Sequence, residues 1–309
     1  MNRKVIMLGI AGDSAAGKTT LSKGIVDALG QDQVTAICCD HYHKYNRVQR
    51  KQSGISALSP EGNYIDIMEQ HFRLLREGQP ILKPVYNHST GDFDAPEYIQ
   101  PTRYVIVEGL LPFHTRLMRL CFDVKVYLNP PEDLRHKWKI KRDTTKRGYT
   151  LEEVLASLNG RKDLSPRYIE PQRALADMVV RFQPPEGHAD ETGGHLNADL
   201  VLRPTIPHPD LTDILQYSGH GAEPALRLEL GRYDGKPVDF LEISGNVTAD
   251  NARKLEEIIQ THLPANSEVD LDRLGRYQSG LVEERSYPLA LTQLLIAYHM
   301  ITAGEAVFT

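Results

Sequence analysis

A glycine-rich segment near the start of the sequence has the residues and spacing of a phosphate-binding loop. Residues 12–19 fit the pattern G-x-x-x-x-G-K-[ST] and stand between a short apolar run and a helical pattern. In such a loop, successive backbone N–H groups face inward and bind phosphate oxygens, while the helix N-terminus adds about half a positive charge. Lys18 would reach the β- and γ-phosphates, and the Thr19 hydroxyl would ligate Mg²⁺. The predicted ATP-binding residues are Gly12, Asp13, Ser14, Ala15, Ala16, Gly17, Lys18, Thr19 and Thr20.

Two acidic residues follow predicted strands. Asp40 comes directly after an expected strand over residues 34–39, and Glu108 comes directly after another over residues 104–107. In open parallel sheets, ligands bind beyond the carboxyl ends of the strands. Glu108 would orient Mg²⁺ or its bound water, and Asp40 would accept the proton of an acceptor hydroxyl, as a kinase requires. From these residues alone, the alternative of ordinary capping or loop carboxylates stays open.

Cations follow the expected base. Arg47, Arg50 and Lys51 come shortly after Asp40. Because guanidinium groups bind phosphate in a bidentate manner, they indicate an acceptor that already carries a phosphate. Residues 79–101, rich in Pro, Asn, Asp and Gly, are expected to form an extended loop that adds further polar groups. A solvated surface loop would have the same composition, and that alternative also stays open.

A long basic helix is expected after Pro130-Pro131, with Gly148 as its stop. Spacings of three and four residues place neighbouring side chains on one face. Cations on this face would close over the ATP phosphates as a lid and stabilise charge as the γ-phosphoryl group moves. A surface helix with ordinary ion pairs is the alternative. The residues concerned are Lys139, Arg142, Asp143 and Arg147, and Arg147 is expected to bind the nucleotide.

The elements that must position these groups alternate between strand and helix. This order predicts an α/β P-loop kinase fold, with a largely parallel sheet flanked by helices, over residues 1–195. A composition break at residues 183–195 predicts a mobile loop. Residues 196–309 are expected to be a C-terminal α+β extension that adds strands to the sheet. The predicted strands are residues 5–10, 34–39, 104–107, 124–128, 199–202, 226–230 and 238–243; the predicted helices are residues 18–29, 66–77, 130–147, 151–158, 249–263 and 287–301.

Composition narrows the class of protein. The net charge of −5 argues against a nucleic-acid binder, and no apolar run approaches the ~20 residues that span a bilayer. The apolar run at residues 5–10 is too short for a signal peptide, so a cytoplasmic location is expected. Three cysteines are too few for a disulfide framework. Cys38 and Cys39 would point to opposite faces of a strand, which argues against a bridge between them.

Taken together, these segments resemble the phosphoribulokinase/uridine kinase family, and within it the plant and cyanobacterial phosphoribulokinases. The resemblance runs from residue 1 to about residue 182 and continues, less strongly, around residues 241–245. The segments that carry it are residues 12–19, 37–43, 46–51, 83–88, 107–110, 138–143, 147–148, 161–162 and 168–172.

The resemblance implies transfer of the ATP γ-phosphoryl group to the C1 hydroxyl of ribulose 5-phosphate, which gives ribulose 1,5-bisphosphate for CO₂ fixation. Asp40 would be the base and Glu108 would support Mg²⁺. The other implied roles are catalysis for Lys18, Lys139, Arg142 and Asp143, and ribulose 5-phosphate binding for His43, Arg47, Arg50, Tyr86, His88 and Arg161. Family members form homodimers, and exposed edge strands beyond residue 195 would suit such pairing.

One departure bears on regulation. Plant and cyanobacterial relatives pair a P-loop cysteine with a cysteine near the base, and here Cys38 matches the second partner while Ala16 replaces the first. The C-terminal cysteine pair of those relatives is also missing, so thioredoxin-type control through these bridges is expected to be absent.

Two other functions remain open. A uridine kinase, or another small-metabolite kinase of the family, would keep the P-loop and Glu108 but present a base-stacking surface instead of Arg47, Arg50 and Lys51. A nucleotide-dependent regulatory protein without transferase activity would not need the complete set of acid, lid and acceptor groups.

Overall fold

The computed structural model describes residues 5–160, 163–189, 191–211, 225–265, 267–280 and 282–305. The chain divides into two compact units. The first comprises Met1–Lys18, Val34–Tyr127 and Arg135–Ala176, and the second comprises Thr19–Gln33, Leu128–Leu134 and Asp177–Thr309. Because these units are defined by contacts and not by continuous stretches of chain, the expected domain boundary after residue 195 stays a prediction.

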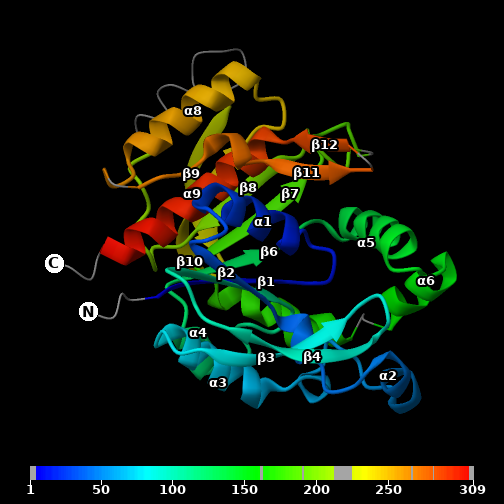
Figure 1. Cartoon of the computed structure of the whole chain (residues 1–309). Helices are drawn as coiled ribbons and strands as arrows, with labels where there is room; N and C mark the ends of the chain where they lie inside the picture. The colour runs from blue at the N-terminus through cyan, green and yellow to red at the C-terminus, as the bar shows by residue number, and fades with distance from the viewer. Residues whose placement is uncertain are drawn as a thin grey trace. The chain divides into compact units, whose positions relative to one another are not determined.

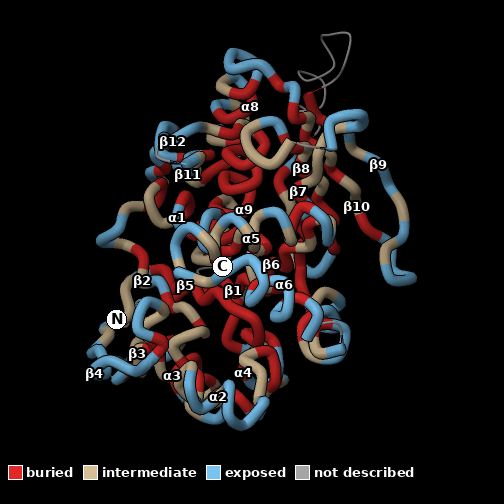
Figure 2. Tube along the Cα trace, turned by 90° about the vertical axis from the view of Figure 1, so that its right-hand side faces the viewer, coloured by how far each residue is buried: buried red, intermediate tan, exposed pale blue. Residues whose placement is uncertain are grey.

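The first unit is built on strands whose side chains are buried. β1 (Ile6–Gly12) is buried along its whole length and pairs in parallel with β5 (Tyr104–Gly109). On its other side β5 pairs in parallel with β2 (Val34–Cys38), and β6 (Val124–Leu128) follows in the order β2-β5-β1-β6. Figure 2 shows β1 and β5 in the colour of buried residues. Continuous apolar strands of this kind are typical of a parallel sheet covered on both faces, as the sequence predicted.

The helices of the first unit follow from spacing and caps. α3 (Ile65–Arg76) buries Met68, Phe72 and Leu75, which recur at three- and four-residue intervals on one face. The expected helix after residue 150 is α6 (Leu151–Asn159), with a capping box between Thr150 and Glu153. The expected basic helix is α5 (Glu132–Lys146), which begins within the second unit's residues and continues in the first. The sequence did not predict the short helices α2 (Arg47–Ser53) and α4 (Arg116–Leu120).

The prediction of an extended loop over residues 79–101 is wrong. This segment is an antiparallel hairpin of β3 (Ile81–Asn87) and β4 (Asp92–Ile99), drawn in cyan in Figure 1. Its proline and polar residues favoured the loop prediction. Pro84 nevertheless fits in the strand, because it coincides with a register shift between Lys83 and Val85, where a missing N–H is tolerated. Exposure of almost all of β4 explains its polar residues. The hairpin matters because it carries Tyr86 and ends beside His88.

The second unit contains four antiparallel strands in the order β7-β8-β10-β9. These are β7 (Met178–Gln183), β8 (Asn197–Leu202), β9 (Leu226–Tyr233) and β10 (Lys236–Ile243). The last three confirm predicted strands, with longer bounds, whereas β7 was missed. Between β7 and β8 the described residues form neither helix nor strand, in agreement with the expected loop; its mobility stays a prediction.

A buried amide joins two of the helices of the second unit, α9 (Tyr287–Glu305) and α1 (Lys18–Leu29). The unit contains most of α1 and also α8 (Ala249–Thr261); both α8 and α9 were predicted. Gln293 of α9 is fully buried; its Nε2 donates to the carbonyls of Thr20 (3.1 Å) and Leu21 (3.2 Å), and its Oε1 accepts the Gly275 N–H (2.7 Å). A Cβ on Gly24 would lie 2.1 Å from that Nε2, so only glycine allows this approach. The amide therefore joins α9 to the helix that follows the predicted phosphate-binding loop.

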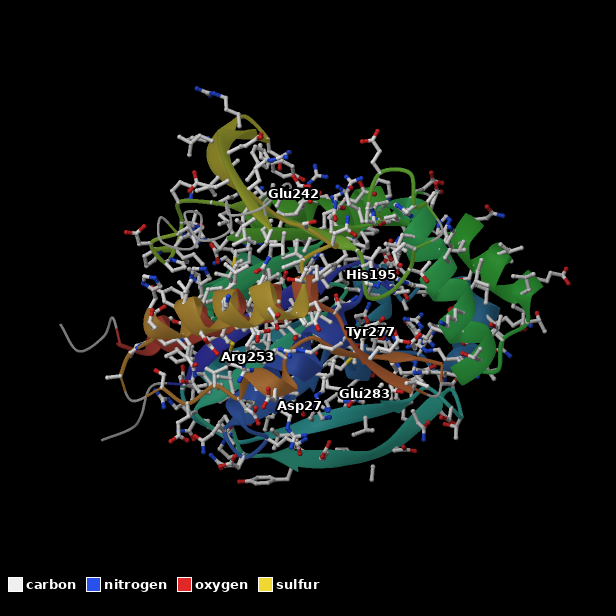
Figure 3. All side chains as sticks on the ribbon, turned by 90° about the horizontal axis from the view of Figure 1, so that it is seen from above. Asp27, His195, Glu242, Arg253, Tyr277 and Glu283 are labelled. Carbon is white, nitrogen blue, oxygen red and sulfur yellow. The ribbon has the colours of Figure 1, made fainter. Side chains whose placement is uncertain are left out.

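A second, smaller sheet completes this unit. The hairpin of β11 (Arg276–Ser279) and β12 (Val282–Arg285) was not predicted. Tyr277 and Glu283, labelled in Figure 3, belong to its two strands. Among the described residues, no helix is both long and apolar enough to cross a membrane.

Candidate active site

The predicted phosphate-binding loop lies between the end of β1 and the start of α1. Ala15 has φ 64° and Gly17 has φ 95°, and these left-handed residues turn the backbone of the loop. The Lys18 ammonium donates to two carbonyls of the same loop, Gly12 O at 2.9 Å and Asp13 O at 2.8 Å. A loop curled around its own lysine in this way fits a nucleotide's terminal phosphates.

Residues from outside the loop hold the carboxylate of Asp13 in place. This carboxylate is buried, accepts a hydrogen bond from the Ser165 hydroxyl at 2.7 Å, and lies 3.6 Å from the Arg135 guanidinium. The Arg142 guanidinium donates to the Ser14 hydroxyl at 3.1 Å. The loop is thus bound to α5 and to the short π-helix Ser165–Ile169. No sequence pattern pointed to Ser165, and Arg135 lies within the predicted basic helix without having been named as a site residue.

Asp40 lies where the sequence placed it, just past the carboxyl end of β2. It belongs to a 3-10 helix, Cys39–Tyr42, and 27% of its side-chain surface is exposed. The strand expected over residues 34–39 therefore ends one residue early, and Cys39 does not alternate with Cys38 as strand residues would. A Cβ on Gly109 would lie 2.3 Å from the Cβ of Cys39, so the glycine after Glu108 lets this turn approach β5. Burial raises the pKa of both cysteine thiols well above the usual value.

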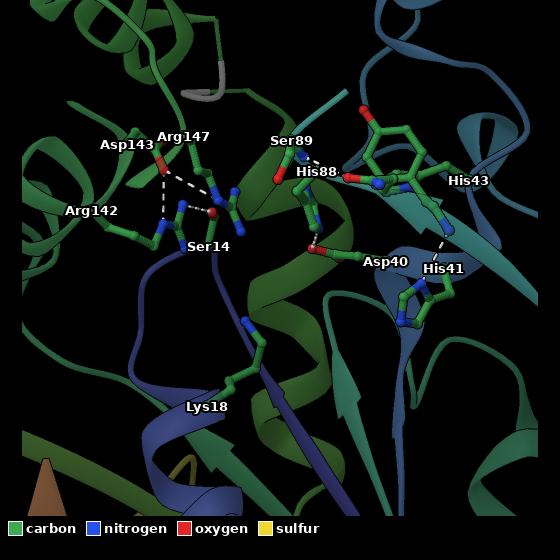
Figure 4. Close-up of polar contacts among 12 residues, drawn as sticks. Ser14, Lys18, Asp40, His41, His43, His88, Ser89, Arg142, Asp143 and Arg147 are labelled. Carbon is green, nitrogen blue, oxygen red and sulfur yellow. Dashed lines mark hydrogen bonds and ion pairs between the residues drawn. The ribbon is translucent and has the colours of Figure 1, made fainter. Parts of the chain in front are cut away.

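The charge of Asp40 is set by the groups around it. Its Oδ2 lies 3.4 Å from His88 Nε2. Burial raises the pKa of Asp40, but the His88 hydrogen bond and the positive charges of His43 and Lys18 outweigh it and hold that pKa well below the usual range. Figure 4 shows the Lys18 ammonium pointing into the space beside Asp40 and Ser14. The carboxylate is therefore ionised and close to the predicted phosphate site.

Beyond Asp40, buried aromatic rings hold an arginine. Tyr86 is almost fully buried, and its hydroxyl accepts a hydrogen bond from Arg50 Nη2 at 2.5 Å. The Arg50 guanidinium also lies 4.8 Å from the centroid of the Tyr86 ring. The His43 ring packs edge-on against Tyr86 with centroids 5.0 Å apart, and its Nδ1 lies 2.8 Å from Asn63 Oδ1. Asn63, which the sequence did not single out, thus fixes the ring of His43.

Arg47 lies against the turn of the β3–β4 hairpin. Its Nη2 donates to the carbonyl of His88 at 2.5 Å, and its backbone N–H donates to Gly91 O at 2.7 Å. His41 contributes a further link, since its Nδ1 accepts the N–H of Tyr86 at 3.1 Å. Each residue that the sequence expected to bind the acceptor lies in this neighbourhood, except Arg161, which falls outside the described residues.

The predicted lid residues converge on one carboxylate. Asp143 of α5 accepts a hydrogen bond from Lys139 Nζ at 2.5 Å. It also accepts from Arg142 Nε at 2.8 Å, and Arg147 Nε lies 3.8 Å away (Figure 4). Burial raises the pKa of Asp143, but the hydrogen bonds and charges of Arg142 and Lys139 prevail and lower it to about 2. The same set of contacts holds Arg142 beside the Ser14 hydroxyl. An ordinary surface helix would not bury Lys139 and Asp143 to 3% and 2% exposure.

The expected magnesium residues differ in burial. The strand expected over residues 104–107 extends to Gly109, so Glu108 lies within β5 and not after it. Glu108 is buried, with Cys38 and Ile10 as its neighbours in register, and Thr19 is exposed in the first turn of α1. The described residues contain no group of three or more His, Cys, Asp or Glu side chains that could hold a metal ion. Mg²⁺ in phosphoryl-transfer sites is usually held by one or two protein groups together with substrate phosphates, and this donor set fits that pattern.

Three comparisons with known proteins agree with one another. The Phosphoribulokinase / Uridine kinase family model matches residues 7–187. The phosphoribulokinase of Synechocystis sp. is 33% identical over 317 residues, covering 96% of this chain and 93% of the relative. The chloroplastic phosphoribulokinase of Triticum aestivum is 34% identical over 291 residues, covering 84% of this chain and 71% of the relative.

A solved structure is similar in fold. The phosphoribulokinase from Rhodobacter spheroides aligns with a TM-score of 0.58 and 20% identity, covering 84% of this chain and 98% of the other. At this identity the likeness supports the α/β fold and nothing finer. The match to the Synechocystis relative extends well beyond residue 187, so it includes most of the chain that the family model leaves out.

Proposed function

Because the chain belongs to the phosphoribulokinase/uridine kinase family, we propose that it transfers the γ-phosphoryl group of ATP to the C1 hydroxyl of ribulose 5-phosphate. The products are ADP and ribulose 1,5-bisphosphate, the CO₂ acceptor of carbon fixation. The observation that carries this proposal is the ionised Asp40, which has the Lys18 ammonium pointing into the space beside it (Figure 4). In contact with its carboxylate lies His88, whose carbonyl binds Arg47. A carboxylate facing both a phosphate site and cations for an anionic sugar suits a phosphorylated acceptor.

The nucleotide is bound by the loop from Gly12 to Thr20. Lys18 leaves the loop carbonyls and contacts the β- and γ-phosphates, while the backbone N–H groups bind the remaining oxygens. Glu108 and Thr19 would hold Mg²⁺, which supplies charge neutralisation at the phosphates when bound. Arg142 of α5 and Arg147, which directly follows this helix, reach the phosphates and stabilise the charge of the transferred group.

The acceptor is bound by the side chains beyond Asp40. Arg47 and Arg50 bind its 5-phosphate. The Tyr86 ring, against which His43 packs, keeps Arg50 in place, and the carbonyl of His88 holds Arg47. Asp40 accepts a hydrogen bond from the C1 hydroxyl, orients it towards the γ-phosphorus, and takes its proton as the new P–O bond forms. His88 maintains the negative charge of Asp40. Arg161, by family resemblance, would add a further contact to the sugar phosphate.

Uridine kinase activity is the alternative, since the family includes it. Two features favour the sugar phosphate. The acceptor side presents guanidinium groups stacked on tyrosine, where a nucleoside would need a free aromatic surface. In addition, the similarity to a phosphoribulokinase spans nearly the whole chain.

A coupled assay of ADP release tests the proposal. The purified protein is given ATP and Mg²⁺ with ribulose 5-phosphate, with uridine, or with no acceptor. We expect the turnover rate with ribulose 5-phosphate to exceed the rate in each of the other two conditions by at least about tenfold. A tenfold ratio corresponds to a preference of about 1.4 kcal/mol. Faster turnover with uridine would establish the alternative, and equal ADP release in all three conditions would indicate a nucleotide hydrolase.

We further propose that the protein forms a homodimer through β9. This strand ends the order β7-β8-β10-β9, and its Leu230 is 84% exposed. Figure 2 shows β9 largely in the colours of exposed and intermediate residues. A strand edge with unpaired backbone groups is a template for pairing with a second copy.

A further inference from the structure

Tyr149 belongs to the segment after α5, yet it contacts an arginine on the acceptor side. The Cζ atom of Arg47 lies 5.0 Å from the centroid of the Tyr149 ring. This distance is within the ~6 Å over which a guanidinium is attracted to an aromatic face. The contact therefore joins two parts of the candidate site that the sequence treated as separate, the lid helix and the acceptor cations.

The backbone fixes Tyr149 relative to the lid helix. Gly148 has φ 70°, the left-handed conformation that ends helices, and the Tyr149 N–H then donates to the Asp143 carbonyl at 3.1 Å. Asp143 is the carboxylate on which Lys139 and Arg142 converge. A movement of the end of α5 would therefore move the Tyr149 ring as well.

The Arg47 side chain, the other partner in this contact, is also held in place. The Arg47 guanidinium bonds to the carbonyl of His88, and a Cβ on Gly91 would lie 2.7 Å from its Nε. That Nε is buried and has no hydrogen-bond partner among the described residues. A buried donor without a partner is costly, and a phosphate oxygen would supply the missing acceptor. The guanidinium is thus held between the hairpin turn and Tyr149.

We propose that Tyr149 is a positioning residue for the acceptor. Its ring holds the Arg47 guanidinium in the orientation that binds the phosphate of the sugar, and it makes that binding depend on the position of the lid helix. The proposal deepens the assigned function and rests on it, because it requires an acceptor that carries a phosphate.

Steady-state kinetics of Tyr149→Leu test this role. We expect the KM for ribulose 5-phosphate to rise by about tenfold, the effect of losing a partly desolvated cation–ring contact, while the KM for ATP stays within about twofold. Tyr149→Phe keeps the ring and should restore the wild-type KM for ribulose 5-phosphate. A purely structural role would instead lower kcat or shift both KM values together. If Tyr149→Leu does not fold, Tyr149→Gln removes the ring with a polar side chain and gives the same comparison.

Two further variants separate the contact from general effects. In an Arg47→Ala background, Tyr149→Leu should cause no additional rise in the KM for ribulose 5-phosphate, because the two residues act as one unit. Tyr233→Leu is the matched control, since Tyr233 lies 5.6 Å from the Arg203 guanidinium in the second compact unit; its KM values should equal those of the wild type.

The outcomes distinguish this inference from the proposed function. If the wild-type protein does not phosphorylate ribulose 5-phosphate, the proposed function fails and the inference falls with it. If the wild type is active but Tyr149→Leu keeps a wild-type KM for ribulose 5-phosphate, or the Arg47→Ala background leaves its effect undiminished, only the inference is overturned.

Discussion

Two carboxylates in the candidate site, Asp40 and Asp143, are kept ionised by different partners. Asp143 is surrounded by lid-helix cations from its own element, and Asp40 is held by His88 and by the charges of His43 and Lys18. A carboxylate with a lowered pKa is a weak proton acceptor. Phosphoryl transfer tolerates this because its loose transition state depends mostly on positioning and charge stabilisation. Asp40 would thus act first by orienting the acceptor hydroxyl and take the proton late.

Asp40→Asn should abolish turnover while leaving nucleotide binding intact. The amide is nearly isosteric but cannot take a proton, so we expect kcat to fall by roughly 10²–10⁴-fold, the range for a lost general base. Calorimetric titration with ADP should give a wild-type Kd. Asp66→Asn, at an exposed position in the first turn of α3, is the control and should retain full activity. Near-normal turnover of the Asp40 variant would show that another group accepts the proton.

At the scale of single elements, the pairing of β8 with β10 includes a destabilising contact between like charges. Asp199 of β8 is directly opposite Glu242 of β10, and like charges in such pairs are destabilising. Burial raises the pKa of Asp199 to about 6, and the charge of Glu242 adds to the shift, while Arg181 and Gln183 oppose it. Glu242 is labelled on β10 in Figure 3.

Asp199 should make stability depend on pH in a defined direction. Because its pKa is raised in the folded state, its contribution is fully present below the unfolded-state pKa near 3.9 and is lost as pH rises through about 6. Asp199→Asn should therefore raise the free energy of unfolding at pH 7.5 by roughly 1–2 kcal/mol, allowing for solvent screening, with little effect at pH 4.

Differential scanning calorimetry at several pH values measures this difference. The expected result is a higher Tm for Asp199→Asn at pH 7.5 and a gap from the wild type that closes towards pH 4. Glu229→Gln, at an exposed position of β9, also removes one negative charge and is the control. Its Tm should equal that of the wild type at each pH. A gap that is constant with pH would mean that the Asp199 charge does not titrate near pH 6.

At the scale of the whole molecule, the second unit has two proposed tasks. One is to hold the start of α1 in place, since Gln293 binds the carbonyls of Thr20 and Leu21 directly after the predicted phosphate-binding loop. The other is the proposed assembly through β9, the last strand in the order β7-β8-β10-β9. Both tasks would explain why the similarity to a phosphoribulokinase continues past the family's kinase core.

Leu230→Lys should weaken the proposed dimer. Lysine on an edge strand opposes pairing with a second copy, because its charge would have to be desolvated or brought close to its symmetry mate. Light scattering after size-exclusion chromatography should show a dimer for the wild type and a concentration-dependent shift towards monomer for the variant. Leu117→Lys, a similarly exposed leucine in α4, is the control and should remain dimeric. A wild-type protein that stays monomeric at micromolar concentration would contradict the assembly proposal.

Local chemistry allowed the sequence to predict much of the framework. The strands β1, β2, β5 and β6 are short apolar runs, and α1, α3, α6, α8 and α9 have helical spacing or caps, so each could be read from neighbours in the chain. The positions of Lys18 and Asp40 followed from the same local rules, because Lys18 begins the helix after a glycine-rich turn and Asp40 follows a recognisable strand.

Only the tertiary structure decided which distant groups meet. The β3–β4 hairpin was not predicted because strands that are exposed or contain proline lack a periodic apolar pattern. Each of the two strands is stabilised by hydrogen bonds to the other, which the sequence of one strand does not reveal. Three contacts join residues that are far apart in the sequence and meet only through packing. They are Asn63 against His43, Ser165 against Asp13, and Tyr149 against Arg47. Sequence patterns specify local conformation, whereas contacts between such side chains arise only when the sheet brings their loops to a common edge.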